Sequence, residues 1–321
     1  MKKLLLIFFL TLAVLLVVGK IADQQYKNYW WPIFEKMNVL IKDSSYYDGI
    51  YLGNSRTHFG INPYYVDSVA SIKTYNMAMG GATINEIEFI ANRYMQNHPP
   101  PKFAVISIGH SGIINTNKYF ENPCYYLFYT QDHFTDSVLK NLHYHTFLYK
   151  LLPISKYTCF DDFNKFSIAE NLKGRTILKP GGVAFKGFIN NSTTALNINA
   201  QEKTNDEQKF EFQKGINILE GIIKLFKQKN TLPIIVYPPS SSFEKSVKNI
   251  VETRIDSAIN SLAEKYRTPV LHFDNDEELP DNYFTDPSHL NIQGTIIYSK
   301  KMGRRISEIL KDNSLVNYNE Y

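Results

Sequence analysis

The stretch GIYLGNSR, residues 49–56, decides the fold class. Its apolar residues predict a short buried strand that breaks at Gly53. A helical stretch at about 62–69 follows, and IKTYNM (72–77) predicts a second strand. A strand, a helix and another strand in this order indicate a parallel sheet with right-handed crossovers.

The same alternation continues along the chain. TINEIEFIANRYMQNH (83–98) predicts a helix with one apolar face and Thr83 as its N-cap, and FAVISIG (103–109) predicts a third strand. The further elements expected are a helix at 206–228, a strand at 232–238, a helix at 247–266, a strand at 269–274 and a helix at 292–310 capped by Asn291. Five strands of this kind predict an α/β domain around a parallel sheet.

The N-terminus carries an export signal. Lys2 and Lys3 precede LLLIFFLTLAVLLVVG (4–19), which has no charged residue. A helix needs about 20 apolar residues to cross roughly 30 Å of hydrocarbon, so this run lies between a signal-peptide core and a full span. No good small-x-small cleavage site follows it. We therefore expect an uncleaved transmembrane anchor with the two lysines in the cytoplasm and the rest of the chain extracytoplasmic, and secretion after cleavage is the alternative.

The composition is that of a globular protein. Hydrophobic residues make up 44% and charged residues 21% of the 321 residues, which argues against global disorder. The net charge of +4 comes without a dense basic stretch, so no nucleic-acid partner is expected. We divide the chain into an anchor (1–22), a membrane-proximal linker or helix (23–47) and one domain (48–321) with an aromatic, loop-rich insertion at about 111–205.

The cysteines and histidines do not form a metal-binding pattern. Cys124 and Cys159 have no CxxC spacing, and His143 and His145 have no third ligand nearby, so we expect no metal and no cofactor. Outside the cytoplasm the two cysteines could form a disulfide, and two buried thiols are the alternative.

Residues that can carry chemistry follow the predicted strands. They are Ser55, Gly80, Gly81, His110, Asp286 and His289. The carboxyl ends of parallel strands meet at one edge of the sheet, where ligands bind, so we expect these residues to meet there. In FTDPSHLN (284–291) an aspartate stands three residues before a histidine. Such a pair orients the general base that a serine nucleophile needs.

Three short blocks resemble the SGNH (GDSL-type) hydrolases. YLGNSRTHFG (51–60) is similar to the block whose serine ends the first strand, and DPSHLNIQG (286–294) is similar to the DxxH block. In YNMAMGGAT (75–83), Gly81 stands five residues after Asn76, as does the glycine that gives an oxyanion N–H in this family. The resemblance covers most of the chain outside the anchor and the insertion. It implies a three-layer sandwich with a flavodoxin-like, five-stranded parallel sheet, and it is nearest to membrane-anchored DltD-like and polysaccharide O-acetylation proteins.

The resemblance implies a role for each site residue. Ser55 is the expected nucleophile, His289 its general base and Asp286 the residue that orients the imidazole. The N–H groups of Ser55 and Gly81 are the expected oxyanion donors. SIGHSG (107–112) departs from the family, because His110 stands where a side-chain donor, usually asparagine, is expected. Loss of such a donor costs about 3 to 4 kcal/mol of transition-state stabilisation, so His110 is the expected replacement.

Together these patterns imply an anchored serine esterase or O-acyltransferase for cell-envelope or exported polysaccharide. The expected partners are an acylated glycan or other ester, the membrane and a membrane acyl-transfer protein. The alternative is a catalytically inactive carbohydrate-binding or assembly module, in which Ser55 caps a helix and His289 lies on the surface. Arg56, beside the nucleophile, binds an anionic substrate group or forms a salt bridge under the site. His110 is either a donor or a structural residue.

Overall fold

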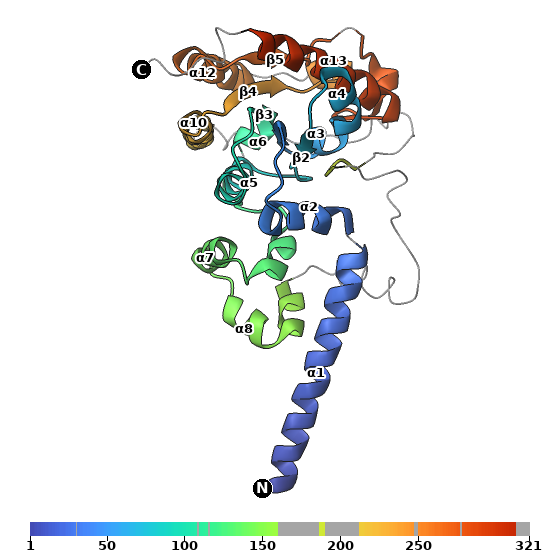
Figure 1. Cartoon of the computed structure of the whole chain (residues 1–321), viewed down its shortest axis with the longest axis vertical. Helices are drawn as coiled ribbons and strands as arrows, with labels where there is room; N and C mark the ends of the chain where they lie inside the picture. Colours follow the sequence, from blue (N-terminus) through green and yellow to red (C-terminus); the bar gives the residue numbers. More distant parts are fainter. Residues whose placement is uncertain are drawn as a thin grey trace. The chain divides into compact units, whose positions relative to one another are not determined.

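The computed structural model describes residues 1–29, 31–107, 109–114, 116–159, 186–189, 212–246, 250–276 and 278–312. The chain forms two compact units (Figure 1). Unit 1 comprises Met1–Ile41 and Asn122–Lys179, and unit 2 comprises Lys42–Glu121 and Pro180–Tyr321. Unit 1 thus groups the N-terminal helices with the central part of the predicted insertion. Unit 2 contains the sheet.

Unit 2 is built on a five-stranded parallel sheet with strand order β2-β1-β3-β4-β5. The strands are β1 Gly49–Leu52, β2 Thr74–Asn76, β3 Phe103–Ser107, β4 Leu232–Tyr237 and β5 Val270–His272. Every residue of β1, β3 and β4 is buried, as the continuous apolar runs require for a sheet covered on both faces. The predicted α/β class and its five-stranded parallel sheet are confirmed, and the strand order is the flavodoxin-like one.

Helices cover both faces of this sheet. They are α3 Ser55–Gly60, α4 Pro63–Ala70, α5 Ile84–Asn97, α6 His110–Ile114, α10 Phe212–Gln228, α11 Ser242–Ser246, α12 Ile250–Lys265 and α13 Ile292–Lys311. α4 packs with α13 on one face, and α10 packs with α5 and α12 on the other (Figure 1). Thr83 accepts from the N–H of Glu86 and Asn291 from that of Gly294, so both predicted N-caps are present. The starts of the helices expected at 206 and 247 lie outside the described residues.

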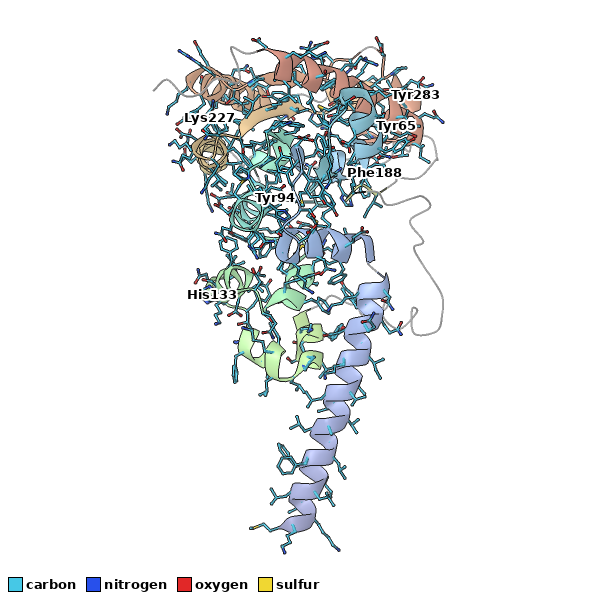
Figure 2. The ribbon with its side chains drawn as sticks, in the orientation of Figure 1. Tyr65, Tyr94, His133, Phe188, Lys227 and Tyr283 are labelled. Carbon is cyan, nitrogen blue, oxygen red and sulfur yellow. The ribbon has the colours of Figure 1, made fainter. Side chains whose placement is uncertain are left out.

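Unit 1 is helical in its described part. Its elements are α1 Lys2–Tyr29, α2 Trp31–Lys42, η1 Pro123–Tyr129, α7 His133–Asn141, α8 Thr146–Leu151 and η2 Pro153–Cys159. α1 is long and apolar enough to cross a membrane, a property that an anchor and a signal sequence share. The side chains of its N-terminal half project outward on all sides (Figure 2). Cys124 is buried, whereas the side chain of Cys159 lies outside the described part, so a disulfide between them stays a prediction.

Candidate active site

A tight turn at the end of β1 presents Ser55 at the edge of the sheet. Gly53 is required there, because a Cβ on this residue would lie 2.8 Å from the carbonyl oxygen of Ser107 on β3. Asn54 then caps α3, and its side-chain oxygen accepts from the N–H of Arg56 at 3.1 Å. Ser55 is the first residue of α3, so its side chain stands beyond the carboxyl end of β1.

α3 is held from two sides. Nδ2 of Asn76, at the end of β2, donates to the carbonyls of Thr57 at 2.9 Å and Ile61 at 2.8 Å. From α13, the hydroxyl of Thr295 donates to the carbonyl of Phe59 at 3.1 Å. These bonds satisfy the last carbonyls of a short helix, which would otherwise fray. Asn76, the buried asparagine in YNM, thus stabilises the end of α3, a role that its sequence context does not reveal.

Asp286 and His289 lie opposite each other in a small antiparallel hairpin, which the sequence analysis did not predict. Its strands are β6 Phe284–Asp286 and β7 His289–Leu290, and Asp286 pairs with His289 across them. Oδ1 of Asp286 accepts from the N–H groups of Ser288 at 2.9 Å and His289 at 3.0 Å. Asp-Pro-Ser favours such a turn, because proline sets φ and the carboxylate captures the turn's N–H groups. The spacing of three residues therefore makes the two side chains cross-strand neighbours.

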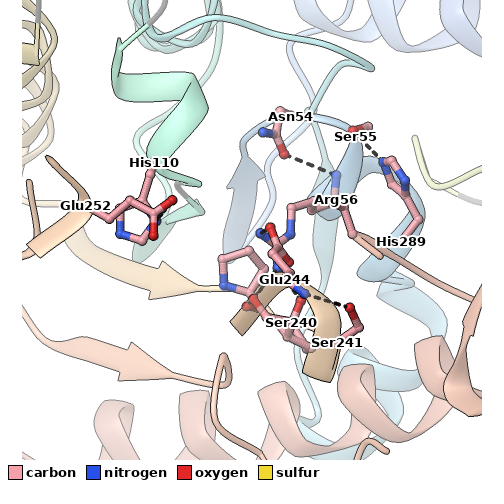
Figure 3. A network of polar contacts seen from close by, with 12 residues as sticks. Asn54, Ser55, Arg56, His110, Ser240, Ser241, Glu244, Glu252 and His289 are labelled. Carbon is pink, nitrogen blue, oxygen red and sulfur yellow. Dashed lines mark hydrogen bonds and ion pairs between the residues drawn. The ribbon is translucent and has the colours of Figure 1, made fainter. Parts of the chain in front are cut away.

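The hairpin brings His289 to Ser55. Nδ1 of His289 lies 2.8 and 2.9 Å from the two carboxylate oxygens of Asp286, and Nε2 lies 2.7 Å from Oγ of Ser55 (Figure 3). An ionised carboxylate only accepts, so it fixes the proton of a neutral imidazole on Nδ1 and leaves Nε2 as an acceptor for the serine hydroxyl. The ring of Phe59 packs edge-on against the imidazole, with centroids 6.0 Å apart. Three residues predicted to meet are thus in direct contact.

The surroundings of Asp286 favour its ionised form. Burial opposes ionisation, but the hydrogen bonds from His289 and from the backbone outweigh it and lower the pKa of Asp286 below the ordinary aspartate value. Asp286 therefore remains a carboxylate throughout the neutral and mildly acidic range. It can hold the imidazole in one tautomer and stabilise an imidazolium cation.

Two of the expected oxyanion donors are backbone N–H groups, those of Ser55 and Gly81. Gly81 has a φ of +74°, and a Cβ there would lie 2.7 Å from Cγ of Glu121, so this position requires glycine. Among the described residues, the N–H groups of Ser55 and Gly81 donate to no protein acceptor. Both are available to a ligand oxygen.

His110 is not beside Ser55. Its Nε2 lies 2.7 Å from Oδ1 of Asp256 on α12, and its Nδ1 lies 4.0 Å from Glu252. In Figure 3 the ring lies beside Glu252, with Arg56 between it and the pair of Ser55 and His289. The geometry thus favours a structural pairing with α12 over the expected role of His110 as a third oxyanion donor.

Arg56 is held by acceptors of its own chain. Nη1 lies 2.9 Å from Oε1 of Glu244, and Nη2 donates to Oγ of Ser240 at 2.9 Å and to the carbonyls of Pro238 and Pro239. These four acceptors follow β4, so the guanidinium fastens the loop after β4 to the helix that bears Ser55. The geometry favours the salt bridge over the expected binding of a substrate anion.

The same loop is fastened to the acid–base hairpin. The N–H of Ser241 donates to the carbonyl of Pro287 at 3.4 Å, and the N–H of Ser242 donates to Oδ1 of Asp281 at 2.8 Å. Residues 238–242 therefore connect the nucleophile's helix with the hairpin that carries Asp286 and His289. Arg56 is a positioning residue in this arrangement, since it acts through the loop and not on a substrate.

An Arg56→Gln variant should lose about 10- to 100-fold in kcat on a small ester with little change in KM, because the loop no longer fixes the distance between Ser55 and His289. The free energy of unfolding should fall by about 1 to 3 kcal/mol, since Glu244 is left without its partner. Arg56→Lys keeps the charge but not the planar fork and should lie in between. Arg305→Gln is the matched control, because Arg305 pairs with Glu308 on the exposed surface. A variant that unfolds more easily but keeps full kcat would leave Arg56 with a purely stabilising role.

A polar cavity opens beside Arg56, beyond the ends of β3, β4 and β5. Its wall includes His110, Tyr237, Ser240, Glu252, Asp274 and Asn275. These carboxylates, the hydroxyl and the amide share the wall with the cations of Arg56 and Lys245 and with apolar surface from Tyr237 and Pro238.

Comparison with known proteins adds little to this geometry. No protein-family model and no curated protein matches the chain. Among solved structures it is similar to the lipase/acylhydrolase from Enterococcus faecalis, at 12% identity over 81% of this chain and 95% of that chain, with a TM-score of 0.40. A likeness this distant carries no information on the reaction, so the functional argument depends on the residues of this chain.

Proposed function

We propose that this protein is a membrane-anchored serine esterase or O-acyltransferase that acts on acylated cell-envelope or exported polysaccharide. The observation that carries the proposal is the contact of 2.7 Å between Oγ of Ser55 and Nε2 of His289, together with the carboxylate of Asp286 on Nδ1. Serine, histidine and aspartate in this order form the arrangement that activates a hydroxyl for acyl transfer.

The reaction follows from these positions. Nε2 of His289 takes the hydroxyl proton as Oγ of Ser55 bonds to the ester carbonyl carbon, and the N–H groups of Ser55 and Gly81 receive the developing oxyanion. The imidazolium returns the proton to the leaving alcohol, and the acyl group stays on Ser55. Water or a sugar hydroxyl then gives its proton to His289 and attacks the acyl carbon, and the imidazolium passes this proton to Oγ of Ser55 as the bond between Oγ and the acyl carbon breaks. Hydrolysis and transfer differ only in this second acceptor.

The substrate class is inferred from the cavity beside Arg56. The carboxylate, amide and hydroxyl groups of its wall can pair with the hydroxyl groups of a glycan. The described wall contains Arg56 but neither Ser55 nor His289, so the cavity supports a subsite for a hydroxyl-rich group next to the helix that bears the nucleophile and does not identify the acyl group.

The role of α1 is inferred from its length and packing. Its 28 residues extend about 42 Å at roughly 1.5 Å each, more than the roughly 30 Å of a hydrocarbon core. The end of the helix belongs to the core of unit 1, where Tyr26 is buried and stacks on Phe128 with ring centroids 5.4 Å apart. Gly19, which a cleavage after Ala22 would remove, also packs against this unit, because a Cβ on it would lie 2.9 Å from the backbone nitrogen of Ile154, and this contact supports a retained anchor over a cleaved signal.

The test compares an acetylated sugar with a long-chain fatty ester in the presence and absence of a free glycan acceptor. We expect a higher kcat/KM for the sugar acetate, an acetylated Ser55 peptide after rapid quenching and mass analysis, and acetyl on the acceptor if the enzyme is a transferase. Preference for the long-chain ester would exclude the glycan assignment. Binding of the glycan without turnover or a trapped acyl group would support the inactive carbohydrate-binding module.

A further inference from the structure

The short helix α8 exposes a patch of large apolar side chains. Phe147 is 74% exposed, Leu148 44% and Leu151 60%. The three lie on one side of a six-residue helix, whereas Thr146 and Tyr149 are buried and attach the helix to the rest of unit 1. Single exposed apolar residues are ordinary, but a contiguous apolar patch marks a surface that contacts something other than water.

The patch lies next to the stretch of α1 that follows the apolar run. η2 begins two residues after α8 and packs against α1, so closely that a Cβ on Gly19 would lie 2.9 Å from the backbone nitrogen of Ile154 and 3.2 Å from Cβ of Pro153. One turn further along α1, Asp23 accepts from Nζ of Lys156 at 2.7 Å. Figure 1 shows α8 beside α1, whose N-terminal half extends well beyond it. All of these elements belong to unit 1, so their mutual placement is that of one compact body.

The contact with Gly19 lies at the level where α1 would leave a bilayer. The exposed apolar side chains of α1 run from Leu4 to Ile21, a length of about 27 Å at roughly 1.5 Å per residue, which is close to the thickness of a hydrocarbon core. Lys20 and Asp23 are the first charged residues after Lys3. The boundary between lipid and water therefore falls near Gly19, where Pro153 and Ile154 touch the helix.

We propose that α8 is a second membrane contact, in which Phe147, Leu148 and Leu151 enter the interfacial layer of the lipid bilayer beside α1. η2 packs against both α1 and α8, so the lipid that surrounds the span at the level of Gly19 also meets α8. Helices of this kind lie in the plane of the interface with their apolar face about 5 to 10 Å into the boundary of head groups and acyl chains. Lys150, the charged residue of α8, pairs with Asp136 of α7 at 2.9 Å, so its charge is neutralised within unit 1. Two contacts fix the tilt and rotation of unit 1, which a single helix would leave free.

The experiment uses the full chain reconstituted in phosphatidylcholine vesicles, with Cys124 and Cys159 replaced by alanine. A nitroxide is placed at Phe147→Cys or Leu151→Cys, and its collision rates with oxygen, which partitions into lipid, and with a water-soluble nickel complex are measured. The aqueous control is Lys140→Cys, because Lys140 is an exposed residue of α7 in the same unit. The ratio of oxygen to nickel collisions should be severalfold higher at 147 and 151 than at 140. Circular dichroism and thermal unfolding confirm that each variant is folded.

A label at Phe9→Cys separates this inference from the proposed anchoring, on which it rests. A lipid-like ratio at 9 with water-like ratios at 147 and 151 would leave the anchor in place and reject the second contact. A water-like ratio at 9, or a mature chain that lacks this residue, would reject the anchor itself. A label at 147 could instead be shielded from both oxygen and nickel, or its spectrum could be broadened by the label on a second copy of the chain. Either result would show that a protein surface covers the patch and would also overturn the proposal.

Discussion

A Ser55→Ala variant should lose about 10⁴- to 10⁶-fold in kcat toward a small acetate ester, because the attacking oxygen is removed while the binding groups and the oxyanion donors stay. KM should change little, since Oγ of Ser55 forms its decisive bond only in the transition state. The measurement is steady-state release of the alcohol by the purified full chain in detergent, with substrate varied well beyond KM.

A fluorophosphonate probe gives the same test independently of turnover. The wild type should form a stable adduct on Ser55, and Ser55→Ala should form none. Ser68→Ala is the matched control, because Ser68 lies on the exposed surface of α4 and its hydroxyl donates to the carbonyl of Tyr65 at 3.0 Å, within its own helix. Undiminished turnover by Ser55→Ala would remove the proposed nucleophile. A folded wild-type protein that takes up no probe would instead favour the binding-module alternative.

The layout of the sheet could be predicted from the sequence because its central strands are uninterrupted apolar runs that alternate with helical stretches. GIYL and LPIIVY are continuous apolar runs between turn residues, a pattern that is typical of short strands buried on both faces. Parallel strands put their carboxyl ends at one edge, so the meeting of Ser55 with His289 followed from topology once the alternation was recognised. The contact that supports the proposed mechanism was therefore foreseeable, although the two residues are 234 positions apart.

The rest depends on contacts that leave no local signal. β7 has two residues, too few for any periodicity, so the hairpin that aligns Asp286 with His289 was not predicted. The partners of Arg56 and His110 stand 188 and 146 positions away, and a single sequence does not show which carboxylate a cation will meet. The resemblance favoured His110 as an oxyanion donor, but Asp256 offers the ring a charged partner at hydrogen-bonding distance. A short charge-assisted bond outweighs a preference carried over by analogy.

Asp286→Asn should lower kcat by about 10³- to 10⁴-fold at neutral pH while the fold is kept. The amide oxygen still accepts from the N–H groups of Ser288 and His289, so the turn persists. The amide nitrogen, however, only donates, and when it faces Nδ1 it places the imidazole proton on Nε2. His289 then cannot accept the proton of Ser55, and the imidazolium loses its counter-charge. Asp312→Asn, at the end of α13, is the matched control and should leave kcat unchanged.

The same variant should reveal the lowered pKa of Asp286 in its stability. A carboxyl whose pKa is lower in the folded than in the unfolded chain stabilises the fold fully above its unfolded pKa, about 3.9, and this contribution disappears as the pH falls through the folded pKa. The part of the difference in unfolding free energy between wild type and Asp286→Asn that comes from this carboxylate should therefore be fully present just above about pH 4 and shrink below it, because the variant has no proton to take up at this position. Urea unfolding at a series of pH values measures the difference directly. If the difference in unfolding free energy stays constant to the lowest pH at which both proteins fold, the carboxylate of Asp286 is not stabilised by His289 and the turn. The argument that Asp286 fixes the tautomer of His289 would then lose its electrostatic basis.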